Sequence, residues 1–193
     1  MKIKKLKFLK SCTKVSDFPD YTYPEYAFLG RSNVGKSSLI NMILGRKKLV
    51  KTGSKPGVTK MINFFLINDD TLIADMPGFG YAKLPAALRK TFMPLIKSYI
   101  KNRKNLKLAF LLIDIRRIPG DFEQQIISLL AENRIPTVIT VTKCDKQSKN
   151  QKLMSSKKIG EFLNIDSESI FFTSSKTGEG KKELLKLIEE FKN

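Results

Sequence analysis

The chain has 193 residues, and its 41% hydrophobic and 28% charged composition is ordinary for a single globular domain with a sizeable core. Thirty-six Lys and Arg residues oppose eighteen Asp and Glu residues, and the net charge of +18 favours a polyanionic partner, with an acidic membrane surface as the competing explanation. The sequence contains no histidine, no run of about 18 apolar residues and only two cysteines, which excludes imidazole chemistry, a membrane-spanning helix and a disulfide framework.

Residues 1–20 form a basic N-terminal extension, in which residues 7–12 could make a short edge strand. No apolar segment of about 7–15 residues follows the basic start, so this segment does not fit a secretory signal peptide. Cys12 and Cys144 form no metal-spaced pair, and a reduced setting suits both thiols. A cytoplasmic protein is therefore predicted, with one domain over residues 21–193 and no internal repeat.

Residues 30–38 read GRSNVGKSS and fit G-x-x-x-x-G-K-[ST], the pattern of a phosphate-binding loop. A short apolar run at 26–29 predicts a buried strand before the loop, and apolar residues at helical spacing predict a helix from the loop to about residue 44. Backbone N–H groups and the helix dipole bind phosphate in this context. Lys36 can reach β- and γ-phosphates, and the Ser37 hydroxyl can ligate Mg²⁺. The candidate phosphate-binding residues are Gly30, Arg31, Ser32, Asn33, Val34, Gly35, Lys36, Ser37 and Ser38.

The remaining chain alternates strands with helices. A mobile loop is predicted at 49–60, where Gly, Ser, Thr and Pro are frequent, and a hairpin turn at 68–70. Strands are predicted at 61–67, 71–75, 106–114, 137–142 and 170–173, and helices at 86–102, 121–133, 147–163 and 179–191. This pattern predicts an α/β fold with a mostly parallel six-stranded sheet, one antiparallel edge pair and helices on both faces.

Four further motifs follow predicted strands or lie in the mobile loop, and the carboxyl ends of strands are where α/β sheets bind ligands. Each motif alone is more often an ordinary turn or surface loop, but their order and spacing after the phosphate loop predict one shared site. The residues that they add are Gly57, Val58, Thr59, Lys60, Met61, Asp75, Met76, Pro77, Gly78, Thr142, Lys143, Cys144, Asp145, Ser174, Ser175 and Lys176.

This combination resembles the EngB family, also called YihA or YsxC, within the translation-factor-related class of GTPases. The stretches GRSNVGKSSLIN at 30–41, SKPGVTKMINFF at 54–65 and DMPGFGYAK at 75–83 carry the resemblance, which extends from about residue 20 to the C-terminus. It implies a Ras-like P-loop fold with an EngB-type G domain. It also implies a GTP-binding protein and slow GTPase that acts as a molecular switch in assembly of the large ribosomal subunit, associated with normal cell division and septation.

The resemblance assigns roles to individual residues. Mg²⁺ would be held by Ser37, by Thr59 when its loop closes on GTP, and by Asp75 through a water molecule. The Gly78 amide would meet the γ-phosphate. Asp145 would accept hydrogen bonds from guanine, because adenine lacks the matching pair of donors. Lys143 would pack along the base and brace the phosphate loop, residues 174–176 would offer a backbone amide to the guanine O6, and Thr142 stands where the common pattern has Asn.

Three positions bear on the rate of hydrolysis. Ras-like enzymes carry a water-positioning Gln where this chain has Phe79, which cannot orient water by hydrogen bonding. No catalytic residue is therefore certain and slow turnover is expected, with Asn33 and Lys36 as candidates for positioning a cation and the phosphates. Asn33 has two interpretations that the sequence leaves open: it helps to bind K⁺ beside the phosphates, or it only caps the local backbone.

The positive charge is spread along the chain. Residues considered for a contact face are Lys83, Arg89, Lys90, Lys97, Lys101, Arg103, Lys104, Arg116, Arg117, Lys146, Lys149, Lys152, Lys157 and Lys158. The resemblance implies ribosomal RNA and proteins of the large subunit or its precursor as the partner, bound by shape and phosphate contacts because no RNA-recognition motif is present. The chain is expected to be a monomer.

Two other functions compete with a GTPase switch. A P-loop kinase or ATPase would need a lid with arginines and an acceptor pocket, and it would not explain the motif at 142–145. A basic RNA-binding module with a vestigial nucleotide site would not explain why Lys36, Ser37, Thr59 and Asp75 are all intact. Nucleotide competition and measurable GTP hydrolysis distinguish these alternatives.

Overall fold

The computed structural model describes residues 1–46, 61–80 and 92–192. The strands are β1 (Leu6–Cys12), β2 (Glu25–Gly30), β3 (Ile62–Ile67), β4 (Thr71–Asp75), β5 (Leu106–Asp114), β6 (Thr137–Thr142) and β7 (Phe171–Phe172). They form one sheet with strand order β1-β3-β4-β2-β5-β6-β7. The helices are α1 (Lys36–Ile43), α3 (Phe92–Asn102), α4 (Asp121–Glu132), α5 (Lys149–Leu163) and α6 (Lys181–Glu190). None of these helices is long and apolar enough to cross a membrane.

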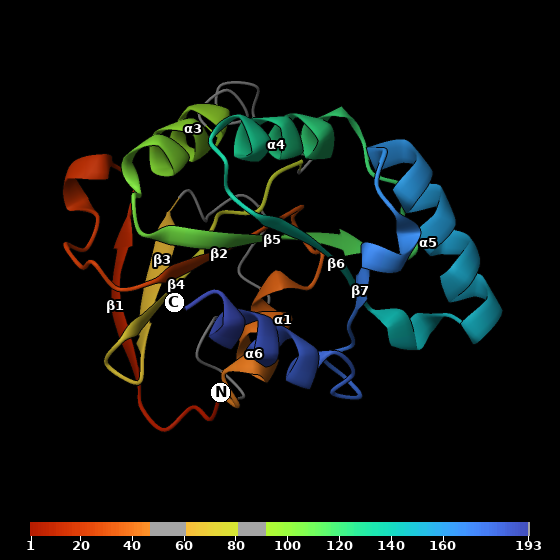
Figure 1. The fold of residues 1–193 in the computed structure, drawn as a ribbon, viewed down its shortest axis with the longest axis horizontal. Helices are drawn as coiled ribbons and strands as arrows, with labels where there is room; N and C mark the ends of the chain where they lie inside the picture. Colours follow the sequence, from red (N-terminus) through yellow and green to blue (C-terminus); the bar gives the residue numbers. More distant parts are fainter. Residues whose placement is uncertain (47–60, 81–91, 193) are drawn as a thin grey trace.

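The sheet is mostly parallel, and β3 alone among the described strands runs against its neighbours, being antiparallel to both β1 and β4. The predicted α/β class, the hairpin of β3 and β4 and the order of the elements are confirmed. The six predicted strands and the possible strand at 7–12 together account for the seven strands that the described residues form. In Figure 1, β1 lies at the edge of the sheet next to β3.

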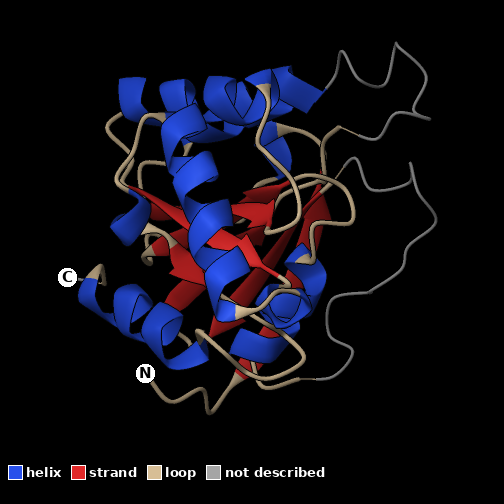
Figure 2. Ribbon diagram, turned by 90° about the vertical axis from the view of Figure 1, so that its right-hand side faces the viewer, coloured by secondary structure: helices blue, strands red, loops and turns tan. Residues whose placement is uncertain are grey.

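Helices cover both faces of the sheet, as Figures 1 and 2 show: α3 and α4 lie on one face, and α1 and α6 lie on the other. The alternation of side chains along β2 explains the two cores. Ala27 and Leu29 belong to the core under α3, α4 and α5, whereas Tyr26 and Phe28 belong to the core under α1 and α6. Since both faces are covered, all six residues of β2 are buried.

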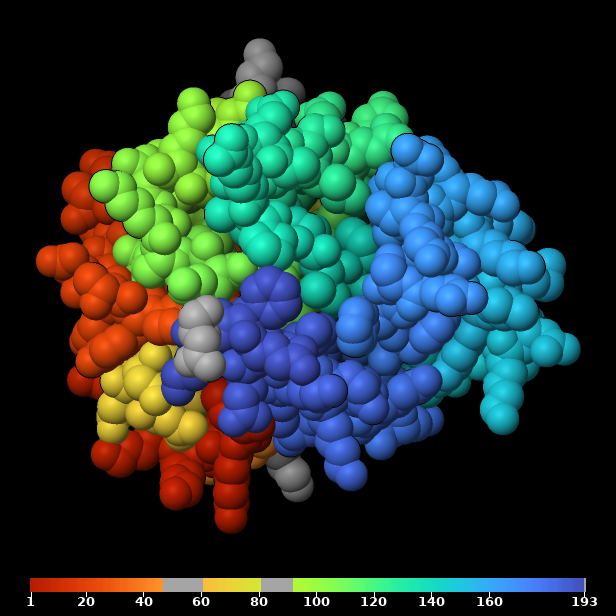
Figure 3. Space-filling view, in the orientation of Figure 1, coloured from red at the N-terminus to blue at the C-terminus, as the bar shows by residue number. Residues whose placement is uncertain are grey.

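The two ends of the described chain meet beside α6. In the space-filling view, the N-terminal residues lie next to the C-terminal helix (Figure 3), and the Met1 ammonium group lies 2.6 Å from the Glu189 carboxylate. Lys192 also donates to Asp70 at 2.6 Å, in the turn between β3 and β4. The basic N-terminal extension therefore packs against the domain through β1 and α6.

Arg103 corrects one expectation about the surface. The sequence placed it among residues for a basic contact face, but its side chain is only 8% exposed and forms an ion pair with the buried Glu25. The Arg103 guanidinium also lies over the rings of Phe18 and Phe64. A run of basic residues does not reveal which member turns inward, because that depends on a carboxylate far away in the sequence.

Candidate nucleotide-binding site

The phosphate-loop motif connects β2 to α1, as the sequence predicted. Gly35 has a φ of +109° and Asn33 has a φ of +64°, and both values lie in the left-handed region. Glycine adopts this region freely and asparagine tolerates it better than most residues, so the loop can curl around one point. The first amides of α1 have no acceptor within the helix, and a helix that begins directly after such a loop is a common arrangement for binding anions.

A buried cation and a buried carboxylate lie together beside this loop. Asp75 ends β4, which pairs with β2, and it is 3% exposed. The Lys36 ammonium group is in direct contact with its Oδ1 atom, and the Asn63 side-chain amide lies 3.4 Å from its Oδ2 atom. The two charges predicted to serve phosphate and metal are thus brought to the same edge of the sheet.

The oxygen atoms at this edge fit Mg²⁺ better than a transition metal. Mg²⁺ is usually held by one or two carboxylate or hydroxyl oxygens together with substrate phosphates and water. Ser37 and Asp75 supply a hydroxyl and a carboxylate from neighbouring elements. Within the described ranges, no three His, Cys, Asp or Glu residues are grouped to make an all-protein metal cage.

The loop after β4 is hydrogen-bonded to the phosphate loop. The Ser32 amide donates to the Phe79 carbonyl at 2.7 Å, and the Phe79 amide donates to the Gly30 carbonyl at 3.3 Å. A Cβ atom on Gly78 would lie 3.0 Å from the Ser32 Cα atom, so any larger residue there would push the two loops apart. Met76 and Pro77 are buried beside them, and this backbone pairing holds Gly78 against the phosphate loop.

The Phe79 ring lies in the hydrophobic core. It is 2% exposed and stacks on Phe122 of α4, with ring centroids 5.0 Å apart. The ring centroid of Phe92 in α3 lies 5.4 Å from that of Phe79. The aromatic residue that occupies the position of the missing glutamine therefore anchors the loop to α3 and α4.

We expect Phe79→Leu to change stability more clearly than hydrolysis. Loss of the aromatic stacking should cost about 0.5–1.5 kcal/mol, while the single-turnover rate of GTP hydrolysis should stay within about tenfold, since roughly 1.4 kcal/mol in the barrier is tenfold. Thermal melting and single-turnover assays on the folded variant measure the two effects. A much larger fall in rate for the folded variant would mean that the ring shapes the reaction site.

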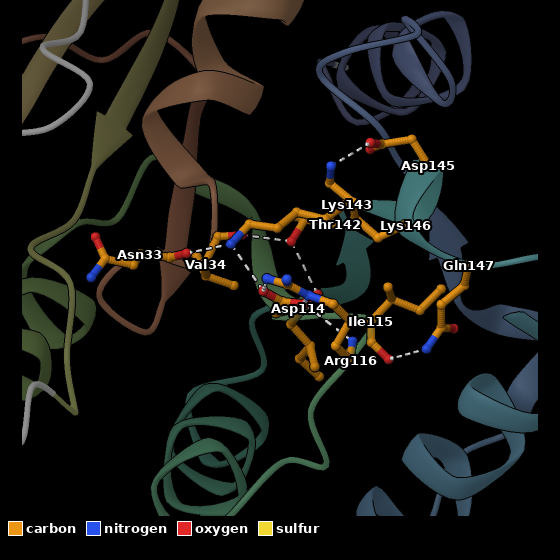
Figure 4. A network of polar contacts seen from close by, with 11 residues as sticks. Asn33, Val34, Asp114, Ile115, Arg116, Thr142, Lys143, Asp145, Lys146 and Gln147 are labelled. Atoms are coloured by element: carbon orange, nitrogen blue, oxygen red, sulfur yellow. Dashed lines mark hydrogen bonds and ion pairs between the residues drawn. The ribbon is translucent and has the colours of Figure 1, made fainter. Parts of the chain in front are cut away.

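The motif at residues 142–145 is joined to the phosphate loop by two side-chain hydrogen bonds. The Thr142 hydroxyl donates to the Val34 carbonyl at 2.6 Å. The Lys143 ammonium group donates to the Asn33 carbonyl at 2.7 Å. Thr142 stands where the common pattern has asparagine and still bonds to the phosphate loop. Lys143 also bonds to the phosphate loop, as the resemblance implied. Figure 4 shows both contacts.

Asp145 lies at the start of a short 3-10 helix and faces the loop after β7. The Ser174 hydroxyl donates to its Oδ1 atom at 2.7 Å, and this bond is the main reason why the pKa of Asp145 is lowered. The Ser174 oxygen in turn accepts from the Lys176 amide at 3.3 Å. The last two predicted motifs therefore meet, and Asp145 is held as a carboxylate.

Cys144 differs from its neighbours because its side chain is fully buried. Burial is the main cause that raises the pKa of its thiol to about 11, so the thiol is protonated at neutral pH.

Of the mobile-loop candidates, residues 57–60 lie outside the described residues, and Met61, just before β3, is exposed. Asn33 has the left-handed backbone that suits asparagine, and its role in a K⁺ site stays a prediction.

Two acidic residues near the site were not predicted. Asp114 ends β5 and lies 2.9 Å from the Lys143 ammonium group, and Glu123 of α4 lies 3.6 Å from the Arg31 guanidinium. Burial alone would raise the pKa of Asp114, but hydrogen bonds from Arg116 and Lys143 outweigh it and hold this pKa well below its usual range. A carboxylate at the end of a buried strand was the available sequence signal for Asp114.

The model of a protein family described as "50S ribosome-binding GTPase" matches residues 25–143 of the chain. A probable GTP-binding protein EngB from Citrifermentans bemidjiense is 44% identical over 181 residues, which cover 94% of this chain and 85% of that protein. The protein of the same description from Fusobacterium nucleatum is 44% identical over 191 residues, and the match covers 98% of each chain.

Solved structures give the same picture of the fold. The crystal structure of a probable GTP-binding protein EngB is 32% identical, with a TM-score of 0.72, and the match covers 86% of this chain and 97% of that one. Era from Aquifex aeolicus, solved with GDP and AlF4⁻, has a TM-score of 0.66 at 21% identity, and the match covers 88% of this chain and 56% of that one. At that identity the second likeness concerns the fold alone.

Proposed function

The chain belongs to the EngB family of GTP-binding GTPases, and from this premise we propose that it is a GTP-dependent molecular switch in assembly of the large ribosomal subunit, with a role in normal cell division and septation. One observation carries the proposal: the elements that would bind phosphate and guanine are bonded to each other. Thr142 and Lys143 donate to carbonyls of the phosphate loop, next to the Lys36–Asp75 pair.

The phosphate side of the site would work by positioning and charge neutralisation, which phosphoryl transfer needs more than covalent chemistry. Lys36 and the amides of the loop would hold the β- and γ-phosphates. Ser37 and, through water, Asp75 would hold Mg²⁺, which when bound neutralises charge on the phosphates; Thr59 is proposed as a further ligand and lies outside the described residues. Gly78, packed against Ser32, would present its amide to the γ-phosphate.

The guanine side of the site would select the base by hydrogen bonding. The carboxylate of Asp145, oriented by Ser174, would accept from the guanine N1–H and 2-amino groups. The stretch from Ser174 to Lys176 would offer a backbone amide to the guanine O6. A P-loop kinase would have no use for this pair, and the bonds from 142–143 to the phosphate loop favour a GTPase over a vestigial site.

Turnover is proposed to be slow without an activator. The Phe79 ring is turned into the core and, as a hydrocarbon, cannot orient a water molecule by hydrogen bonding. Asn33 remains a candidate to help place K⁺ beside the phosphates, and comparing hydrolysis in K⁺ with that in Na⁺ would test it. We propose a cytoplasmic monomer, as its cysteine content and family suggest.

The proposed partner is the large subunit or its precursor, contacted through RNA phosphates and ribosomal proteins. The net charge of +18 supplies the long-range attraction. Basic residues that remain exposed are Lys97, Lys101, Lys104, Arg116, Arg117, Lys146, Lys149, Lys157 and Lys158. Lys152 is only partly exposed and is paired with Glu179 at 2.7 Å. Lys83, Arg89 and Lys90 lie outside the described residues.

Cosedimentation with large-subunit precursors tests the switch. We expect tighter binding with a non-hydrolysable GTP analogue than with GDP, because a nucleotide can shift binding only through differential contacts. Total binding should fall steeply with salt as counterions are released from phosphates, while the nucleotide-dependent difference should persist at moderate salt.

Two variants serve as controls for the cosedimentation. Lys36→Ala should bind equally in both nucleotide states, because it should lose the nucleotide itself. Lys186→Glu, changed at an exposed residue of α6, should lower only the background. Equal binding of the unaltered protein in the two states across the salt series would reject the switch.

A further inference from the structure

Two segments converge on the carboxylate of Asp114, the last residue of β5, which is 5% exposed. The Arg116 side chain donates twice to it, from Nε to Oδ1 at 2.9 Å and from Nη2 to Oδ2 at 2.7 Å. The Arg116 backbone amide also donates to Oδ1 at 3.1 Å. From the other side, the Lys143 ammonium group lies 2.9 Å from Oδ2. Figure 4 shows this network between β5 and the loop after β6.

The same ammonium group of Lys143 donates to the Asn33 carbonyl at 2.7 Å. Lys143 therefore bridges two groups, a neutral carbonyl of the phosphate loop and the charge of Asp114. Its backbone has a φ of +61°, a left-handed conformation that a residue other than glycine keeps only when the surroundings impose it. The position of this lysine is thus set by its contacts and not by local preference.

Of the two partners, Asp114 is the one that can fix the lysine. A lysine ammonium group is a compact charge on a flexible stem, and one neutral carbonyl restrains it weakly. A buried carboxylate restrains it strongly, because hydrogen bonds between charged groups are about twice as strong as neutral ones. Arg116 is half exposed and saturates the remaining acceptor sites of Asp114, which keeps the carboxylate ionised and immobile.

We propose that Asp114 is a positioning residue of the nucleotide site: it holds the Lys143 ammonium group on the Asn33 carbonyl, with Arg116 as its clamp, and thereby locks the phosphate loop to the guanine-binding segment. The inference rests on the proposed nucleotide site and adds two residues to it. Asp114 touches neither base nor phosphate in this scheme, so it should govern how long a nucleotide stays bound but not which base is chosen.

The test uses Asp114→Asn, which removes the charge at nearly constant shape. Measured with fluorescent GDP and a GTP analogue, affinity for both should fall by roughly ten- to a hundredfold, the range for losing one hydrogen bond between charged groups. The loss should appear as faster dissociation of both nucleotides. The preference for guanine over adenine nucleotides should stay unchanged. Asp69→Asn, the same change in an exposed ion pair at the far end of β4, is the matched control and should leave binding unaltered.

A double-mutant cycle with Lys143→Met shows whether Asp114 acts through the lysine. In that background Asp114→Asn should have no further effect on dissociation. An equal loss in both backgrounds, or native dissociation in Asp114→Asn, would overturn the inference. Arg116→Gln, changed at a half-exposed side chain, should give a smaller acceleration that also vanishes without Lys143, and it decides the matter if Asp114→Asn does not fold. Absence of guanine nucleotide binding by the unaltered chain would instead refute the proposed function and this inference together.

Discussion

Asp145→Asn is expected to convert a protein that prefers guanine nucleotides into one that prefers xanthine nucleotides. The carboxylate would accept two hydrogen bonds from guanine, whereas an amide presents a donor that suits the 2-oxo group of xanthine. Such polar mismatches in a site discriminate by roughly 10⁴. The Ser174 hydroxyl, 2.7 Å from Oδ1, can also bond to the amide oxygen, so the new side chain should keep the orientation of the old one.

Titrations of Asp145→Asn with labelled GDP and xanthosine diphosphate measure this exchange of preference. Asp166→Asn is a suitable control, because Asp166 accepts from the Glu168 amide away from the site, and an asparagine oxygen can accept the same bond. The control should bind GDP as the unaltered chain does. Undiminished GDP affinity in Asp145→Asn would show that this carboxylate does not read the base.

The fold could be predicted where local signals agree with tertiary packing. The apolar run at 106–114 matches β5 at both ends, because a strand covered on both faces is apolar over most of its length. The helix predicted at 147–163 begins two residues later, at Lys149, since Ser148 caps it and Gln151 completes the capping box. These are interactions between near neighbours, which a sequence displays directly.

The convergence of the site could also be predicted, because the topology of a parallel sheet places the ends of strands at one edge. The structure brings Lys36, Asp75, Lys143 and Asp145 to that edge from three separate segments, since the last two share the loop after β6. The nucleotide roles of these residues remain predictions.

Contacts between distant residues could not be predicted from patterns in one sequence. Phe79 was recognised as a departure at the position of a glutamine, but its burial depends on Phe122 of α4 and Phe92 of α3. Asp114 appeared only as the polar end of a strand, and its partner Lys143 is contributed by the loop after the next strand. In both cases the deciding interaction is between elements that the chain brings together only on folding.

Among the substitutions considered, removing the guanidinium of Arg103 is expected to cause the largest loss of stability. From the sequence, this residue was considered for a basic contact face. Arg103 makes a bidentate pair with Glu25, which is fully buried, and its Nη1 atom donates to the Pro19 carbonyl at 2.9 Å. The Tyr99 hydroxyl donates to the same carboxylate at 2.6 Å. Arg103→Ala would leave Glu25 charged and buried, which costs about 3–5 kcal/mol.

For a chain of this length, such a loss should lower the melting temperature by roughly 10 °C, since 1 kcal/mol corresponds to about 2–4 °C. Lys104→Ala removes the same charge from the neighbouring exposed residue and should change the melting temperature little.

Adding Glu25→Gln to an Arg103→Met variant should recover much of the stability, because no buried charge remains and the Gln oxygen still accepts from Tyr99. Equal melting temperatures for Arg103→Ala and Lys104→Ala would show that the pair contributes nothing. Glu25 begins β2, and the phosphate loop follows the other end of this strand. The folded fraction of the Arg103, Lys104 and Glu25 variants should therefore bind nucleotide as the unaltered chain does.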